Sequence, residues 1–533
     1  MRMLSYPAIR SAGHFPRGLT IRSFREVSQA WIAEQVVSLM IMALALIARL
    51  SVGPITIDDA FITFRYARNL AEGHGFVYNL GERVLGPPTP LDTMLLAILY
   101  RLGLHDLPHV ALTVNAAADA VTAIVLIRLA LHLGLGRWWA GLIGFLFALA
   151  PLSVAFAAGG MESSLFTLLV VAAVAADVRN RTCLAGVLAG LAILTRPEGA
   201  VLAGLIIGRH LLNRHLPPRS TIIAFGLVLL PWVLFSSWYF GGPIPESIMA
   251  KASHYQADPL FNIVTLIGNL GAPGFNSDAF NAPHGHLLIL GSLLLGTFSL
   301  GLTCSQARTL IRYGVRHPST CSLVVFAPLL MLAYILEGFK SAHIFPWYLV
   351  PFVPFCVFGA VAIWRLAARR LPLPLQMFGT MVLVAWVLLG FNLGSVSNRA
   401  VLAPRGLNLS REEAYTKAAG LLSARVPSRA VVALPEIGAF GYYSQSRILD
   451  TAGLVSPIAA KFYPLPAGFR SDITAPPELI RLEQPEYLVG LDRFLPGQLQ
   501  TADWFQRDYR LLTSYDAQIW EGNQVLVYER VNR

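Results

Sequence analysis

The chain has 533 residues, of which 55% are hydrophobic and only 13% are charged, against about 25% charged residues in an average soluble protein. This composition excludes a disordered chain, a coiled coil and a disulfide scaffold. Lys and Arg number 41 and Asp and Glu 30, a formal charge of +11. Because these positive charges are scattered, they argue against a nucleic-acid-binding protein. Most of the chain is therefore expected to lie in a lipid bilayer.

Long apolar runs recur over the first three-quarters of the chain. They predict an α-helical multi-pass membrane protein. Pro197 interrupts one continuous apolar stretch, which we divide into two short segments. The eleven predicted transmembrane segments are at about 31–52, 109–132, 138–158, 162–178, 183–196, 198–212, 220–241, 286–304, 320–337, 347–365 and 375–395.

One further apolar run, residues 90–104, is too short to count as a span. Its 15 residues cover roughly 22 Å, whereas the hydrocarbon core is roughly 30 Å thick. When it is left out, 18 Lys and Arg residues fall on one side of the membrane and 8 on the other. The positive-inside rule then places the N-terminus in the cytoplasm and residue 396 onward outside. We expect 90–104 to lie at the outer surface of a bacterial inner membrane.

The chain therefore divides into a cytoplasmic segment 1–30, a membrane domain 31–395 and an extracytoplasmic α/β domain 396–533. The first 30 residues and the first span are typical of an uncleaved signal anchor. Two outer loops, 53–108 and 243–285, interrupt the membrane domain. In the C-terminal domain, Ser410 and Glu413 form a capping box that opens a helix to about Ser423. Short strands are predicted at Ala430–Leu434, Tyr487–Gly490 and Gln524–Glu529.

The first outer loop opens with two adjacent acids, Asp58 and Asp59. The residues after them predict an amphipathic helix just above the first span, because its apolar residues share one face. Aspartates at a helix start serve as caps. One cap needs only one aspartate, however, and acids this close to hydrocarbon are usually functional. From spacing alone, capping and function stay equally open.

Several motifs together carry a family resemblance. They are DDAFITFRYARNLAEGHGFVYNLGERV from residue 58, GMESSLF at 160–166, TRPEG at 195–199, PIPESIMAK at 243–251 and PEIGAFGYYSQSRILDTAGLVSP at 435–457. In this order they resemble GT-C glycosyltransferases that use polyprenyl-phosphate sugars. Among such enzymes, the chain resembles the mycobacterial arabinofuranosyltransferases more than it resembles the aminoarabinose lipid A transferases or the protein O-mannosyltransferases. The resemblance extends over nearly the whole chain.

The resemblance implies that a sugar moves from a lipid phosphate to an acceptor hydroxyl at the outer face, with inversion. Asp58 or Asp59 would be the base that takes the acceptor's proton. A free aspartate, with a pKa near 3.9, is a weak base at neutral pH. A second carboxylate beside it, close to apolar surface, raises one pKa of the pair. We favour Asp58 slightly over Asp59, and the pair can titrate as a unit.

Cations are expected to stabilise the phosphate leaving group. Lys251 is the first candidate, because it matches a lysine of the resembling motif; a solvated loop lysine is the alternative. Arg65 and Arg68 are second choices that could equally reach lipid headgroups. Arg196 would contact the donor phosphate or form a structural ion pair with Glu198 across Pro197.

Three further residues, Tyr66, Glu162 and Glu198, are candidates for substrate binding. Glu162 could instead be an ordinary charge at a helix N-terminus. Asp119, in mid-span, is expected to have a structural partner inside the bundle. His284 and His286 are weak candidates for a divalent metal, which some relatives use, and a headgroup-level or gating loop is the favoured alternative. No other cofactor is predicted.

Two loops depart from the family pattern. Asp92 stands where relatives often have Trp, and Glu246-Ser247 where they often have Asn-Thr or Asn-Ser. These changes leave the sugar and the acceptor open. The expected partners are a polyprenyl-phosphate sugar, an envelope glycan, lipid or protein acceptor, and the bilayer. The alternatives are a transporter or flippase of lipid-linked sugars, and an inactive envelope-assembly protein. The midplane broken helices and internal repeats of transporters are not evident here.

Overall fold

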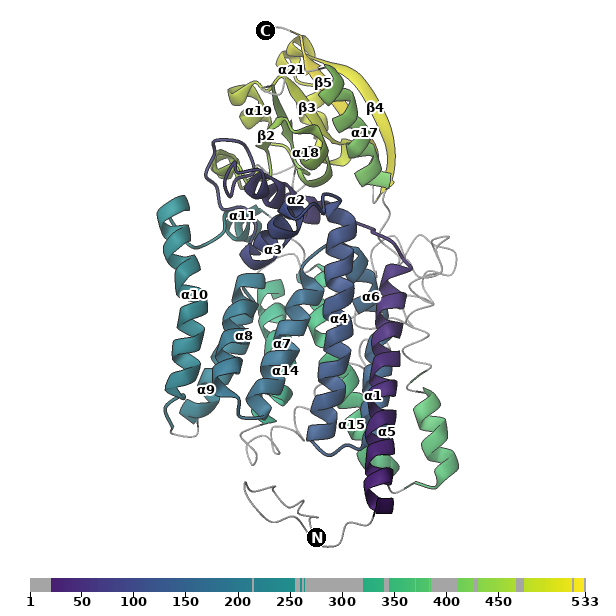
Figure 1. Ribbon diagram of the computed structural model, residues 1–533. Helices are drawn as coiled ribbons and strands as arrows, with labels where there is room; N and C mark the ends of the chain where they lie inside the picture. The colour runs from purple at the N-terminus through teal and green to yellow at the C-terminus, as the bar shows by residue number, and fades with distance from the viewer. Residues whose placement is uncertain are drawn as a thin grey trace.

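The computed structural model describes residues 21–212, 215–254, 259–260, 263, 320–339, 345–369, 371–382, 384, 410–425, 430–465, 474–519 and 522–531. These residues form a bundle of apolar helices with a sheet domain on one end of it (Figure 1). A layer of short helices lies between the two parts. The predicted domain boundary at residue 396 falls outside the described residues.

The bundle contains helices long and apolar enough to cross a bilayer. Three of them are α1 (Ile21–Leu50), α4 (Leu107–His132) and α10 (Arg219–Phe240), and a fourth segment, Pro346–Leu366, joins η3 (Pro346–Phe352) to α15 (Val353–Ala368). The predicted span 138–158 is a bent pair, α5 (Arg137–Ala148) and α6 (Pro151–Ala158), with a bend of 43°. The bend falls where Pro151 begins the second helix, because proline cannot continue the hydrogen bonding of the first.

The remaining apolar helices are shorter: α7 (Ser163–Val178), α8 (Thr182–Thr195), α9 (Gly199–Leu212), α14 (Cys321–Phe339) and a helix over residues 373–382. The stretch around Pro197 is two helices, as predicted. The predicted span 286–304 and most of 375–395 lie outside the described residues. The chain is thus a multi-pass helical protein, and the number eleven stays a prediction.

Small residues and buried ion pairs help to hold the bundle together. Gly186 and Gly190 of α8 face α10 so closely that a side chain there would meet the Thr221 backbone or Val228, the close approach that small residues four apart allow in membranes. Asp119 has the buried partner predicted for it. The Arg49 Nε donates to its carboxylate over 2.6 Å, and neither side chain is exposed.

The short helices at the sheet-domain end are α2 (Asp58–Ala71), α3 (Pro90–Arg101) and α11 (Glu246–His254). The expected surface helix at 90–104 is α3, outside the bundle (Figure 1). The amphipathic helix after the Asp pair is α2, with ten of its 14 residues buried. It is buried more completely than one apolar face predicts, because the sheet domain covers it from the other side.

The sheet domain has five strands in the order β2-β1-β3-β5-β4. The strand β1 (Val431–Leu434) runs parallel to β2 (Arg447–Asp450) and β3 (Tyr487–Leu491), while β5 (Gly522–Arg530) is antiparallel to β3 and β4 (Tyr509–Ile519). The predicted helix and three strands are α17 (Ser410–Arg425), β1, β3 and β5. The other helices are α18 (Gly438–Ser444), η4 (Pro457–Phe462), α19 (Pro477–Glu483), η5 (Asp492–Phe494), α20 (Gly497–Gln500) and α21 (Asp503–Asp508).

Candidate active site

The two adjacent aspartates occupy the first turn of α2, and neither caps that helix: the cap residue is Ile57, without a side-chain hydrogen bond. The Asp58 carboxylate instead accepts hydrogen bonds from the backbone N–H groups of Gly438 and Ala439, over 2.9 and 2.8 Å, at the start of α18. Asp58 is only 6% exposed. The Asp59 side chain is 31% exposed and faces another group, the Lys251 ammonium, at 3.2 Å.

Asp58 lies at the junction between α2 and the sheet domain. Burial raises the pKa of Asp58 to about 7, while the Arg411 guanidinium and the Ala439 N–H lower it and the Glu436 carboxylate raises it. Arg411 is itself paired with Glu436, over 2.6 Å. The predicted rise in pKa therefore occurs at Asp58, and its cause is burial under the sheet domain. The neighbouring Asp59 is not among its principal causes.

Lys251 lies in α11, and its ammonium contacts both the Asp59 carboxylate and the face of the Phe345 ring, 5.1 Å from the ring centroid. Burial lowers the pKa of Lys251, but the Asp59 charge, Tyr348 and the hydrogen bond to Asp59 outweigh it, so the pKa is raised overall. Lys251 therefore stays charged at neutral pH. A half-buried cation beside a carboxylate is a group that an anionic ligand can compete for.

Next to this pair, Arg196 joins two acids at the turn between α8 and α9. Its Nη1 and Nη2 atoms lie 2.9 Å from Glu162 Oε1 and 2.9 Å from Glu198 Oε1. The guanidinium also stacks over the Tyr348 ring, 4.9 Å from its centroid. The structural ion pair considered for Arg196 and Glu198 is present, and Glu162 extends it to three residues. Tyr348 links this group to Lys251, since its ring interacts with both cations.

Two buried acids complete the cluster. Burial raises the pKa of Glu162, although the Arg196 charge lowers it. Asp92, in the first turn of α3, is 4% exposed and makes no side-chain hydrogen bond within the described part of the chain. Burial, with the charge of Glu162, raises its pKa well above the ordinary value.

Arg65 and Arg68 point to the sheet domain. Arg65 donates to the backbone carbonyls of Gly441 and Ser446, each over 2.7 Å, and Arg68 donates to Tyr442 over 2.9 Å. These contacts join the first outer loop to α18 and the residues after it.

Tyr66 also makes contacts that hold the loop. Its hydroxyl donates to the Val84 carbonyl over 2.7 Å and accepts from the Gly86 N–H over 3.1 Å. The three residues Tyr66, Arg65 and Arg68 thus have structural partners, and none of those partners belongs to the Asp59–Lys251 pair.

Several site residues were not predicted. Phe345, Tyr348 and Tyr334 surround the two cations, and the Tyr334 hydroxyl donates to Glu198 over 3.2 Å. In the sequence, these aromatic residues are indistinguishable from residues that pack in the bundle or face lipid. The sequence offered two signals for the site: the Asp pair, and Lys251 after a proline-rich turn. The structure brings Lys251 and Asp59 together.

The metal candidates His284 and His286 lie outside the described residues. Among the residues that the structure does describe, no group of three or more His, Cys, Asp or Glu side chains could hold a metal ion. The predicted metal therefore stays a hypothesis.

The helical bundle, the layer of short helices that carries the acidic pair and the sheet domain beyond that layer make up a fold that also occurs in solved structures. Two solved structures of ArnT from Cupriavidus metallidurans share it. The structure bound to undecaprenyl phosphate matches with a TM-score of 0.53 and 14% identity, over 94% of this chain and 98% of that chain. The apo structure matches with a TM-score of 0.55 and 13% identity, over 95% and 98%. The predicted fold class is confirmed.

The chain is also similar in sequence to a curated protein. The terminal beta-(1->2)-arabinofuranosyltransferase of Mycobacterium tuberculosis is 28% identical over 219 residues, which are 36% of this chain and 34% of the relative. The match thus spans about a third of each protein. Residues 406–528 match a family model described as a domain of unknown function, DUF8728. The chain thus shares the fold of ArnT and, over about a third of its length, is similar to an arabinofuranosyltransferase, in line with the resemblance that its motifs carry.

Proposed function

We propose that this protein is a membrane glycosyltransferase that moves a sugar from a polyprenyl-phosphate donor to an acceptor hydroxyl in the cell envelope. The single observation that carries the proposal is the pair formed by the Asp59 carboxylate and the Lys251 ammonium, 3.2 Å apart, where the bundle meets the sheet domain. A carboxylate that can accept a proton and a cation that can hold a phosphate are the two groups that this reaction requires.

The two groups act in sequence. When the donor phosphate binds the Lys251 ammonium, it replaces the Asp59 carboxylate there and leaves that carboxylate free. Asp59 then takes the proton of the acceptor hydroxyl while the acceptor oxygen forms a bond to the anomeric carbon. The bond from that carbon to the phosphate oxygen breaks, and its electron pair stays on the polyprenyl phosphate. Attack from the face opposite the leaving phosphate inverts the configuration.

The assignment of the base differs from the first choice made from the sequence. Asp58 has the raised pKa, but both of its oxygens accept backbone N–H groups and its side chain is buried. Asp59 is partly exposed and adjacent to the cation. Since a general base must reach the proton it removes, we assign that role to Asp59. Asp58 is a positioning residue that holds α2 against α18.

The proposal also includes the identity of the sugar donor and the orientation of the protein in the membrane. The ArnT structure is bound to undecaprenyl phosphate, and the chain shares its fold. We therefore take an undecaprenyl- or decaprenyl-phosphate hexose or pentose as the donor, and an envelope glycan, glycolipid or protein as the acceptor. The excess of Lys and Arg in alternate loops supports a bacterial inner membrane location with the N-terminus in the cytoplasm. The site then faces outward.

The test is transfer by the purified full chain in nanodiscs, supplied with a panel of polyprenyl-phosphate sugars. Wild type is expected to release or transfer sugar from at least one donor, and Asp59→Asn is expected to lose that activity. Asp516→Asn removes the same charge from an exposed position on β4 and should behave like wild type. If wild type consumes no donor but moves one across a vesicle membrane, the protein is a flippase of lipid-linked sugars and not a transferase. If it neither transfers sugar nor moves a donor, the result favours the third alternative, an inactive envelope-assembly protein.

A further inference from the structure

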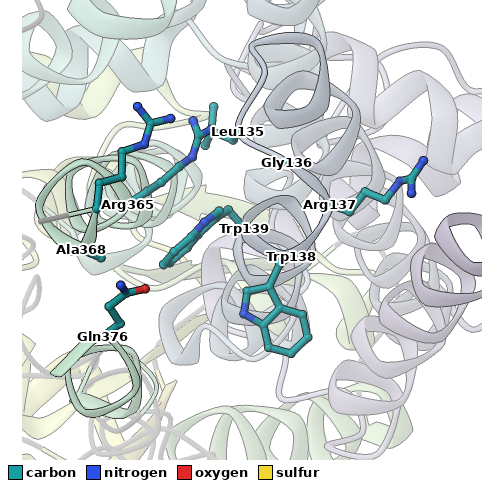
Figure 2. Close-up of a pocket in the computed structure, with 9 residues that line it drawn as sticks. Leu135, Gly136, Arg137, Trp138, Trp139, Arg365, Ala368 and Gln376 are labelled. Atoms are coloured by element: carbon teal, nitrogen blue, oxygen red, sulfur yellow. The ribbon is translucent and has the colours of Figure 1, made fainter. Parts of the chain in front are cut away.

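A cavity of about 390 Å³ lies where α5 begins and α15 ends, at the end of the bundle opposite the sheet domain. Figure 2 shows Trp139, Arg365 and Gln376 turned toward the same space, while Arg137 and Trp138 point away from it. The lining residues are Leu135, Gly136, Arg137, Trp138, Trp139, Arg365, Ala368, Arg369 and Gln376, none of them acidic.

The charge of this cavity comes from two arginines. Arg365 and Arg369 are four positions apart, so they lie one turn apart on the same side of the α15 terminus. Arg365 is held by its Nη2, which donates to the Gly134 carbonyl over 2.8 Å. Within the described residues, no carboxylate pairs with Arg365 or Arg369, whereas the Arg137 Nε lies 3.4 Å from Glu34. The two guanidiniums are therefore open to an external anion.

The surroundings of the cavity show which kind of anion reaches it. Trp138 is 80% exposed, and Leu366, Leu373 and Phe378 are 57%, 67% and 65% exposed on the helices beside it. Exposed apolar side chains at the end of a membrane bundle contact acyl chains, and tryptophans concentrate at the headgroup level. The two arginines are thus at the depth where lipid phosphates lie.

We propose that this cavity binds the phosphodiester headgroup of an anionic phospholipid. Arg365 and Arg369 donate to the phosphate oxygens, and the Trp139 ring packs against the glycerol and the first acyl carbons. The cavity volume lies within the range of roughly 300–1,000 Å³ that small-molecule sites have. The site does not depend on the proposed glycosyl transfer, because it lies at the opposite end of the bundle from α2 and α11, the helices that carry Asp59 and Lys251.

The experiment compares the full chain in nanodiscs of phosphatidylcholine with and without phosphatidylglycerol. Retained lipid is measured by native mass spectrometry, and the unfolding midpoint by intrinsic fluorescence. We expect wild type to retain phosphatidylglycerol and to unfold at a higher temperature with it. The double variant Arg365→Gln/Arg369→Gln should retain about tenfold less, the order of magnitude for losing a charge-assisted hydrogen bond.

The matched control is Arg181→Gln/Arg219→Gln, which removes two exposed arginines at the starts of α8 and α10, at the same end of the bundle. It should retain phosphatidylglycerol like wild type, and equal midpoints in phosphatidylcholine alone would show that both variants fold. The proposal is overturned if the cavity variant retains the lipid as tightly as wild type, or if the control loses as much. It is also overturned if inorganic phosphate produces the same gain in midpoint, because the cavity would then be a site for the free ion.

Discussion

Adjacent residues in this chain have opposite surroundings, and the sequence shows only that they are adjacent. Asp58 and Asp59 are successive residues of one helix turn, so their side chains point in different directions. One contacts backbone N–H groups more than 370 positions further along the chain, and the other contacts Lys251. The sequence identified the pair and the lysine from their types and motif. The sequence could not assign separate roles to Asp58 and Asp59, because those roles depend on which of the two side chains the sheet domain covers.

Replacement of Lys251 tests its role toward the donor phosphate. Lys251→Gln removes the charge, and donor affinity should fall by about 10- to 100-fold, the range for losing a hydrogen bond to a charged group. Lys251→Arg keeps the charge and should recover part of the loss. The measurement is a donor titration of initial transfer rates. A Gln variant with an unchanged KM for the donor would contradict a phosphate contact.

At the scale of elements, α2 and α18 form one unit although 366 residues separate their ends. Arg65, Arg68 and Asp58 all join them, and each has a partner in α18 or the residues directly after it. Gly438 and Gly441 permit this, because a side chain at either position would collide with Asp58 or Tyr78. The motifs at both sites were visible in the sequence. Their contact was not, because nothing in a single sequence pairs such distant positions.

Replacement of Arg65 should weaken this junction. Arg65→Gln leaves the buried carbonyls of Gly441 and Ser446 without their donors, and each unsatisfied group costs about 1–3 kcal/mol. We expect a lower unfolding midpoint and faster proteolysis between the bundle and the sheet domain. Arg101→Gln, at an exposed position on α3, is the control and should match wild type. Equal protection of the Arg65 variant would show that the junction rests on other contacts.

Among the strands, the sequence predicted three of five. The strands β1, β3 and β5 combine apolar residues with clear boundaries, and all three are central in the sheet. The two edge strands were missed. The strand β2 has only four residues, and the pairing of β4 with β5 is interrupted twice, which breaks the alternation expected of a regular strand.

At the scale of the whole molecule, stability is coupled to pH through buried acids outside the membrane. Burial raises the pKa of Asp58 from 3.8 to about 7, and the pKa of Asp450 likewise to about 7. The folded protein therefore holds more protons than the unfolded chain between these values. Stability should fall as the pH rises through this window and then level off above about 7.

Thermal unfolding in nanodiscs across this pH range measures the effect. Asp58→Asn should flatten the decline, because Asn does not titrate, whereas the exposed-site variant Asp516→Asn should keep the wild-type slope. The Asn variant also loses one acceptor for the α18 N–H groups, so its midpoint should be lower at acidic pH. A wild-type midpoint that rises from acidic to neutral pH would contradict the assignment of raised pKa values to these acids.

The central proposal is that the donor phosphate binds the Lys251 ammonium and thereby frees the Asp59 carboxylate to act as the general base. The most direct test is the single-turnover rate of sugar transfer at saturating donor for wild type, Asp58→Asn and Asp59→Asn, with the unfolding midpoint of each. We predict that Asp59→Asn keeps the wild-type midpoint and loses about 10²- to 10⁴-fold in rate, the usual contribution of a general base. Asp58→Asn should lower the midpoint and lose less rate. A rate for Asp59→Asn within a few-fold of wild type would show that Asp59 is not the general base.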